Sequence, residues 1–296
     1  MTSPWKPCDC IIIGAGPAGL SAALEAARQG LSVEVYEAAR PGGQALAASL
    51  VTNFPGYPGG IPGRELMRRW VDHIDSSGIK IVLERVTNLS KEDGLFTART
   101  ENRKVIGHSA IVAVGLKPRK LSIPGESELS GRRLFSYVDP TTLRHADKRV
   151  VIIGGGDVAF DMALAFATSA RSVTIVMRGS APACTRSLLE RAMEAEISIV
   201  SGHEVVSLSE DSYGARVNLR NNLAERKLDA DIIVSCIGKE PMVDFLDRSL
   251  TRGAKGLFLA GDLRQGRQCH ICMAAGDGTA AAFAAAEYLK TVTRDS

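Results

Sequence analysis

The first forty residues alternate between apolar and polar stretches in a way that predicts a strand, a helix and a second strand. Residues 10–13 read CIII, an unbroken apolar run that is typical of a strand buried on both faces of a sheet. A helical pattern over residues 20–28 ends before Gly30, and residues 32–36 predict the second strand. This order predicts the start of a parallel α/β fold.

The turn after the first strand carries a G-x-G-x-x-G pattern. Residues 14–19 read GAGPAG, and an acid follows the second strand at about the 20-residue spacing that dinucleotide-binding units show. The first glycine permits a tight turn, the second lets backbone N–H groups approach a pyrophosphate, and the acid accepts a hydrogen bond from a ribose. A glycine loop with a purely structural use is the alternative. The residues predicted to bind a dinucleotide here are Gly14, Gly16, Pro17, Ala18 and Glu37.

The same unit occurs a second time. Residues 150–153 predict a strand, residues 154–159 read GGGDVA, and a helix over 161–170 and a strand over 172–177 are expected to follow. Two such units in 296 residues predict an α/β protein with two Rossmann-like dinucleotide-binding domains, the second inserted into the first.

The second unit lacks the acid that follows the second strand of the first. Met177 and Arg178 stand at that position. Arg178 could pair with the 2′-phosphate of a nucleotide or could be a solvated surface side chain, and the sequence favours neither interpretation. The residues expected to hold the second dinucleotide are Gly154, Gly156, Asp157, Val158, Met177 and Arg178.

Composition and charge narrow the class of protein. The chain has 36 Lys and Arg against 33 Asp and Glu, and 45% of its residues are hydrophobic. This globular composition excludes disordered and coiled-coil chains, and the balanced charge argues against dedicated nucleic-acid binding. No apolar segment reaches the roughly 18 residues of a membrane span, and no signal-peptide pattern precedes the first strand. We therefore expect a cytoplasmic protein.

Further motifs make the chain resemble the low-molecular-weight thioredoxin reductase family over essentially its whole length. Beside the two glycine-rich turns, the matching pieces are PGGQ at residues 41–44, NFPG at 53–56, AGD at 260–262 and AAGDG at 274–278. The resemblance implies a homodimer and an FAD-binding domain made of residues 1–115 and 246–296. Residues 116–245 would form the inserted second domain. The additional residues that the resemblance places near FAD are Gly43, Gln44, Asn53 and Asp262.

The chain departs from this family where the family has its redox disulfide. The family carries Cys-x-x-Cys after a Ser-Tyr pair, but Val138 and Thr141 occupy the two cysteine positions here. Neither side chain can form a disulfide. The arginine cluster that the family uses for its nicotinamide cofactor is also reduced to Arg178 and a displaced Arg186, which argues against NAD(P)H as the second dinucleotide.

A Cys-x-x-Cys appears instead near the end of the chain. Counted without gaps from the AGD motif, Cys269 and His270 take the place of the Arg-Gln pair that opens the family's flavin-facing helix; a gapped alignment matches Arg267 and Gln268 to that pair. Either alignment puts Cys269 and Cys272 at a helix N-terminus, where residues three apart share a face and the helix dipole favours a thiolate. His270 could transfer a proton. We expect a redox disulfide and no metal, with two structural cysteines or a metal site as the alternatives.

The other cysteines fit structural positions. Cys10 and Cys236 lie in apolar strand patterns and are expected in the core, whereas Cys8 is expected near an exposed start of the chain.

The lost disulfide, the gained one and the weakened nicotinamide site together resemble the diflavin-linked disulfide oxidoreductases, a thioredoxin-reductase-like family with a second FAD in the pyridine-nucleotide site. The resemblance implies that a small or protein dithiol exchanges with a disulfide between Cys269 and Cys272, and that electrons pass to FAD and then to the second FAD. An NAD(P)H-dependent reductase acting on ferredoxin, flavodoxin or a disulfide is one alternative. A flavin-binding sensor without turnover is another. A quinone acceptor would bring the chain to a membrane surface, but no amphipathic anchor is evident.

Overall fold

The computed structural model describes residues 6–48, 50–136, 138, 143–222, 224–250, 253–266 and 270–292. The chain folds into two compact units. The first comprises Met1–Lys117 and Pro241–Ser296, and the second comprises Pro118–Glu240. The chain passes between them through β7 (Leu116–Pro118) and β16 (Lys239–Pro241), which pair as a two-stranded sheet.

The first unit is built on a sheet in the order β3-β2-β1-β6-β5-β4, with β17 also paired to β6. Strands β1, β2, β3, β6 and β17 pair in parallel, whereas β5 and β4 are added by antiparallel pairing. The strands are β1 (Cys8–Ile13), β2 (Val33–Tyr36), β3 (Ile81–Val82), β4 (Asn88–Glu92), β5 (Leu95–Arg99), β6 (Lys104–Val112) and β17 (Leu257–Leu259).

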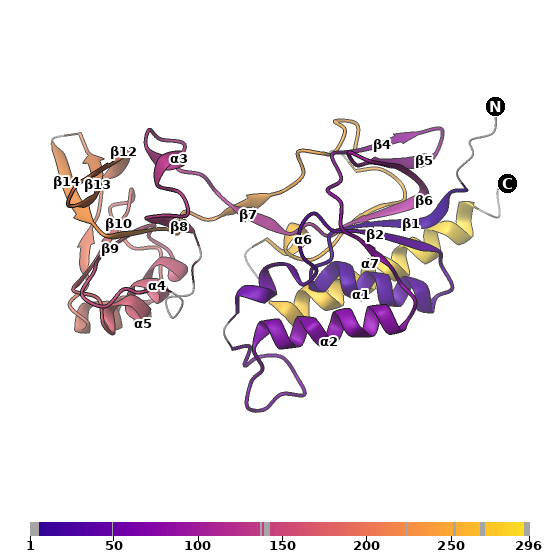
Figure 1. Cartoon of the computed structure of the whole chain (residues 1–296), viewed down its shortest axis with the longest axis horizontal. Coiled ribbons are helices and arrows are strands. Elements are labelled where there is room, and N and C mark those ends of the chain that lie inside the picture. Colours follow the sequence, from indigo (N-terminus) through magenta and orange to yellow (C-terminus); the bar gives the residue numbers. More distant parts are fainter. Residues whose placement is uncertain are drawn as a thin grey trace. The chain divides into compact units, whose positions relative to one another are not determined.

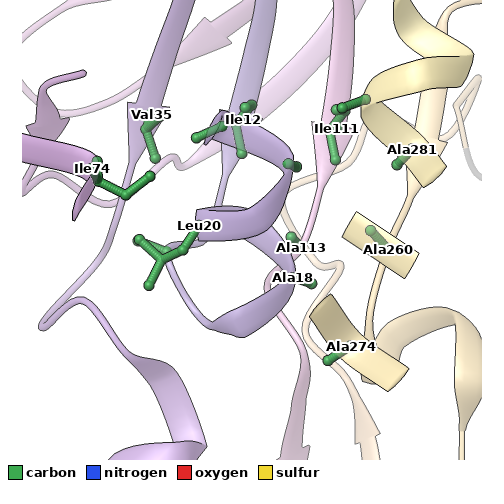
Figure 2. Packing of buried hydrophobic residues seen from close by; sticks show 14 of the residues in the cluster. Ile12, Ala18, Leu20, Val35, Ile74, Ile111, Ala113, Ala260, Ala274 and Ala281 are labelled. Carbon is green, nitrogen blue, oxygen red and sulfur yellow. The ribbon is translucent and has the colours of Figure 1, made fainter. Parts of the chain in front are cut away.

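Three helices of this unit, α1 (Pro17–Arg28), α2 (Gly63–Ser76) and α7 (Ile271–Val292), lie along the same side of the sheet (Figure 1). Their apolar faces meet alternate strand residues in one core, because successive strand side chains point to opposite faces. Figure 2 shows Ile12 and Ile111 from the strands close to Leu20 of α1 and Ala281 of α7. Two short helices, η1 (Gly43–Ala47) and α6 (Asp262–Gln265), lie in the connections.

The second unit has a five-stranded parallel sheet in the order β11-β10-β9-β15-β8. One face packs on α4 and α5, and the other packs on an antiparallel sheet of β12, β13 and β14 with α3. The parallel strands are β8 (Leu134–Ser136), β9 (Arg149–Ile153), β10 (Ser172–Val176), β11 (Ser198–Val200) and β15 (Ile232–Ser235). The other elements are α3 (Glu126–Leu129), α4 (Asp157–Ala167), α5 (Arg186–Glu194), β12 (Glu204–Asp211), β13 (Gly214–Arg220) and β14 (Glu225–Ala230).

Both predicted strand–turn–helix–strand units are present, and the predicted α/β class is confirmed. The helix starts were wrong: α1 begins at Pro17 and α4 at Asp157, because each glycine-rich turn ends inside the first helical turn. A proline is tolerated there because the first helical N–H has no intrahelical acceptor. The expectation for Cys8 was also wrong. Strand β1 begins at this residue, and the side chain is buried against the sheet.

The helices of the described ranges include none that is long and apolar enough to cross a membrane.

Helix α7 packs so tightly on the start of α1 that one position has no room for a side chain. A Cβ on Gly278 would lie 2.0 Å from the backbone oxygen of Ala18. We expect Gly278→Ala to lower the midpoint of thermal unfolding by about 5 °C, since overpacking costs roughly 1–3 kcal/mol. The control is Gly276→Ala in the same helix, where a Cβ would meet no atom within 4 Å. It should raise the midpoint slightly, because alanine favours a helix. Equal melting of the two variants would contradict this packing.

Candidate functional site

The first glycine-rich turn forms a backbone cradle at the N-terminus of α1. Gly14 has a φ of +101°, and a Cβ there would lie 2.5 Å from the oxygen of Ala113. Gly16 faces Gly43 across the cradle, where a Cβ on Gly43 would lie 3.1 Å from the Cα of Gly16. No side chain caps the first N–H groups of α1. A helix N-terminus with bare backbone donors fits the pyrophosphate of a dinucleotide.

Glu37 stands at the end of β2, next to this cradle. One carboxylate oxygen accepts a hydrogen bond from the N–H of Ala15 at 2.9 Å, and the other accepts from the N–H of Ala39 at 2.9 Å. Two backbone donors hold the carboxylate in place, and each oxygen keeps a lone pair for a further donor. This donor set fits the ribose hydroxyls of an adenosine.

The other residues predicted for FAD belong to the same unit. The side-chain amide of Gln44, in η1, donates to the oxygen of Leu116 at 2.6 Å. Asp262 is the first residue of α6 and follows Gly261. A Cβ on Gly261 would lie only 2.8 Å from the Cβ of Ala18. The turn before α6 therefore packs directly on the helix that opens with Pro17. Figure 2 shows Ala18, Ala260 and Ala274 in this region of close packing.

Asn53 contacts both described residues of the predicted redox cluster. The thiol of Cys272, in the first turn of α7, donates to the backbone oxygen of Asn53 at 3.4 Å. The side-chain nitrogen of Asn53 lies 3.1 Å from Nδ1 of His270. Nδ1 of His270 is therefore engaged by the Asn53 side chain. Asn53 and His270 are exposed and Cys272 is half-buried, so solvent reaches this cluster. Cys269 lies outside the described residues, as do Arg267 and Gln268.

An aromatic cluster that the sequence analysis missed braces the loop of Asn53. The ring of Phe54 packs edge-on against Trp70 of α2 at 5.6 Å and lies 6.2 Å from Tyr57. A β-bridge between Val51 and Ile61 closes the loop at its base. The aromatic residues can be read from the sequence, but the contact between the loop and α2 is a tertiary one. The two aromatic residues that follow Asn53 within one short loop are the sequence feature that could have indicated this cluster.

The second glycine-rich turn is also packed backbone against backbone. A Cβ on Gly154 would lie 2.4 Å from the oxygen of Cys236. The next segment folds onto the turn: the N–H of Ala183 donates to the oxygen of Gly155 at 2.7 Å, and that of Thr185 donates to Asp157 at 2.7 Å. One Asp157 oxygen is therefore used within the protein.

The remaining residues predicted for the second site differ in exposure. Val158, at the start of α4, is 45% exposed. Met177 is buried against Gly155: a Cβ on Gly155 would lie 3.1 Å from the Cβ of Met177. Arg178 is exposed, and the displaced Arg186 pairs with Glu190 of its own helix at 2.7 Å. Gly156 has open space at its Cα. Val138 is half-buried in the core of this unit, and Thr141 lies outside the described residues.

Comparisons with known proteins identify the family. The chain matches the Pyridine nucleotide-disulphide oxidoreductase family over residues 8–287. It belongs to this family. Thioredoxin reductase of Treponema pallidum (strain Nichols) is 32% identical over 300 residues, covering 96% of this chain and 98% of that protein. The thioredoxin reductase structure of Lactococcus lactis, in the FR conformation, has a TM-score of 0.83 at 28% identity and covers 96% of this chain and 99% of that one. The T. acidophilum thioredoxin reductase has a TM-score of 0.78 at 28% identity, covering 97% and 99%.

Membership in the pyridine nucleotide-disulphide oxidoreductase family confirms part of the sequence analysis. The thioredoxin reductase-like fold and the class of flavin-dependent disulfide oxidoreductase were both predicted correctly. FAD is the cofactor expected of this family, and the cradle of the first unit fits it.

Three cysteine thiols of this protein are buried too deeply to react in the folded state. Burial raises the pKa of Cys8, Cys10 and Cys236 to about 12. At about pH 8 these three thiols therefore stay protonated. Cys184, half-buried in the second unit, also has its pKa raised by burial.

A short pulse of iodoacetamide should separate these thiols from the cluster. In the reduced protein at about pH 8, Cys272 should be alkylated before Cys8, Cys10 and Cys236, because it is half-buried whereas those three are buried. Cys8, Cys10 and Cys236 should react only after unfolding in urea. Peptide mass mapping of the pulse-labelled protein measures this order. Early labelling of Cys236 in the folded protein would contradict the assignment.

Proposed function

We propose that this chain is an FAD-dependent dithiol/disulfide oxidoreductase whose redox pair is Cys269 and Cys272. The observation that carries the proposal is the contact of Asn53 with both His270 and Cys272 at the start of α7. The proposal is also supported by the other cysteines, because three have thiols that burial keeps protonated.

The exchange step follows from thiol chemistry. One thiolate of a substrate dithiol attacks the disulfide between Cys269 and Cys272, which forms a mixed disulfide and releases one protein thiolate. The second substrate thiol then displaces the other protein sulfur. The products are the substrate disulfide and the reduced pair, so two electrons have moved from substrate to protein.

The described residues support this step in two ways. Cys272 lies in the first turn of α7 and is half-buried, so its sulfur is not enclosed in the core. His270, with Nδ1 engaged by Asn53, can exchange a proton at Nε2 with the sulfur or the substrate. Bound FAD would supply an acceptor for two electrons. The residues proposed to hold it are Gly14, Gly16, Pro17, Ala18, Glu37, Gly43, Gln44, Asn53 and Asp262.

Two dinucleotides compete for the second unit, and different observations favour them. The exposed Arg178 and the pairing of Arg186 with Glu190 leave no arginine cluster in the described part of this site, which argues against the 2′-phosphate of NADPH and so favours a second FAD. With a second FAD as acceptor, we propose the thiol-oxidising direction. The family favours NAD(P)H: an Arabidopsis thaliana relative at 30% identity is named NADPH-dependent thioredoxin reductase 3. We propose the second FAD, held at Gly154, Gly156, Asp157, Val158, Met177 and Arg178.

We further propose that the protein acts as a cytoplasmic homodimer on a small or protein dithiol. Light scattering of the purified protein measures the dimer directly.

The number of flavins separates these two dinucleotides. FAD released from the denatured, purified protein should approach two per polypeptide if the second unit holds FAD. The absorbance of the released flavin against the protein concentration measures this ratio. A ratio near one, with rapid bleaching of the flavin by NADH or NADPH, would replace the second FAD with a nicotinamide cofactor.

The redox role of the cluster is tested by Cys272→Ser. Serine keeps the size and the hydrogen bond to Asn53 but cannot form a disulfide, so dithiothreitol-driven reduction of bound FAD should fall at least about hundredfold. Stopped-flow absorbance under anaerobic conditions measures the rate. Cys184→Ser is the matched control, because this half-buried cysteine lies in the second unit, and its rate should equal that of the wild type. Unchanged reduction of FAD in Cys272→Ser would refute the mechanism. If dithiothreitol does not reduce FAD in the wild type, the alternative of a flavin-binding sensor without turnover would take its place.

A further inference from the structure

We propose that Asp277 is a positioning residue that holds the turn before Asp262 against the helix that carries Cys272. The inference rests on the proposed function for the thiol, but its FAD-binding part stands on the first unit alone. Asp277 contacts neither FAD nor substrate in this account, and it acts through the turn.

Asp277 is a carboxylate buried among small apolar side chains. The residue is 7% exposed, and its neighbours on the same face of α7 include Ala274, Gly278 and Ala281, all buried. A carboxylate is very rarely buried unless it is paired, because removing its charge from water is costly. The Asp277 carboxylate, in a helix face that otherwise packs through alanine and glycine, therefore needs a hydrogen-bond donor or a cation as its partner.

Both oxygens of Asp277 have such a partner in the turn that ends in α6. One accepts a hydrogen bond from the N–H of Gly261 at 2.8 Å, and the other pairs with the guanidinium of Arg264. Gly261 directly precedes α6, and Arg264 is the third residue of this helix. The carboxylate therefore fastens this short helix at both its start and its middle.

The shape of this turn has to be imposed from outside. Gly261 has φ +72° and ψ −148°, a conformation open to glycine, whose backbone is otherwise the least restricted. The buried bond to Asp277 selects that conformation and so fixes the backbone on which Asp262 begins. Loss of the bond frees the turn and moves Asp262 away from the place where it is proposed to hold FAD.

The same bond sets Asp262 relative to the thiol. Asp277 follows Cys272 on one continuous helix, at a distance of about 7.5 Å along the axis from the helical rise. The helix and the anchored turn thus form one rigid piece that carries both the thiol and the proposed FAD ligand.

The two bonds differ in what they contribute. Arg264 has a side chain that is 60% exposed, and an ion pair to such a group is screened by water. The bond to Gly261 is buried, and a hydrogen bond to a charged group contributes more. The account therefore assigns the positioning to the Gly261 bond.

Three variants and a control test this assignment. Asp277→Ala removes both bonds, Asp277→Asn keeps an amide oxygen that can accept from Gly261, and Arg264→Gln removes only the exposed partner. The control is Asp231→Ala in the second unit, where the carboxylate likewise accepts from a backbone N–H and a guanidinium, both of Arg149. The Kd of the FAD site in the first unit is measured on each apoprotein by quenching of flavin fluorescence, in a titration that resolves it from the FAD site proposed for the second unit. The reduction rate by dithiothreitol is measured at saturating FAD.

The positioning account predicts a definite order. Asp277→Ala should raise the Kd for FAD about tenfold or more and slow flavin reduction at saturating FAD by a similar factor, as expected for loss of a hydrogen bond to a charged group. Asp277→Asn and Arg264→Gln should stay within about threefold of the wild type, since each keeps the Gly261 bond. Asp231→Ala should melt at a lower temperature, but the FAD site of the first unit should keep its Kd.

Two results would overturn the inference. One is an unchanged Kd for FAD in Asp277→Ala. The other is an effect of Asp277→Asn as large as that of Asp277→Ala, which would assign the role to the charge pair. If Asp277→Ala does not fold, Asp277→Ser, which also loses the carboxylate but stays polar, is judged by the same criteria. A wild-type protein that dithiothreitol cannot reduce would refute the proposed function, while the Kd values would still decide the role of Asp277.

Discussion

The first unit depends on a contact between its two ends that leaves no room for a side chain. Gly278 of α7 lies so close to Ala18 of α1 that only glycine fits, and the turn before α6 packs on the same alanine. Close packing of this kind is rigid, because interiors are as dense as organic crystals. It brings the helix of Cys272 against the N-terminal cradle, although the two lie at opposite ends of the sequence (Figure 2). The proposed flavin and thiol sites are therefore parts of one piece.

The loop of Asn53 completes this piece from a third part of the chain. Its aromatic brace on α2 holds the residue that contacts His270 and Cys272. The proposed chemistry thus relies on hydrogen bonds to Asn53 and on backbone packing. Among the described residues of α7, the one buried acidic side chain is Asp277. A buried charge held by two partners is costly to leave unpaired, which suits a residue whose work is to hold a shape.

Sequence patterns were sufficient for the parts of the fold that local rules govern. The glycine-rich turns could be recognised because tight turns and close backbone approach admit few residues other than glycine. The apolar runs before them are typical of buried strands, and the turns after them supported that interpretation. The helix starts at Pro17 and Asp157 were placed too late, because the turn and the first helical turn share residues. The burial of Cys8 was missed because the strand begins two residues before the apolar run becomes unbroken. The contact of Asn53 with His270, the aromatic brace and the anchor at Asp277 could not be predicted, because they join segments far apart in the chain. Asp277 in particular sits in a motif that was recognised only by its resemblance to a family.

The central claim is that a disulfide between Cys269 and Cys272 exchanges electrons with the flavin, and an anaerobic titration with dithionite tests it most directly. Each disulfide takes up two electrons in addition to those of the flavins. The account predicts that the wild type consumes two more electrons per polypeptide than Cys272→Ser, with the same flavin content in both proteins. Equal consumption by the two proteins would contradict the claim.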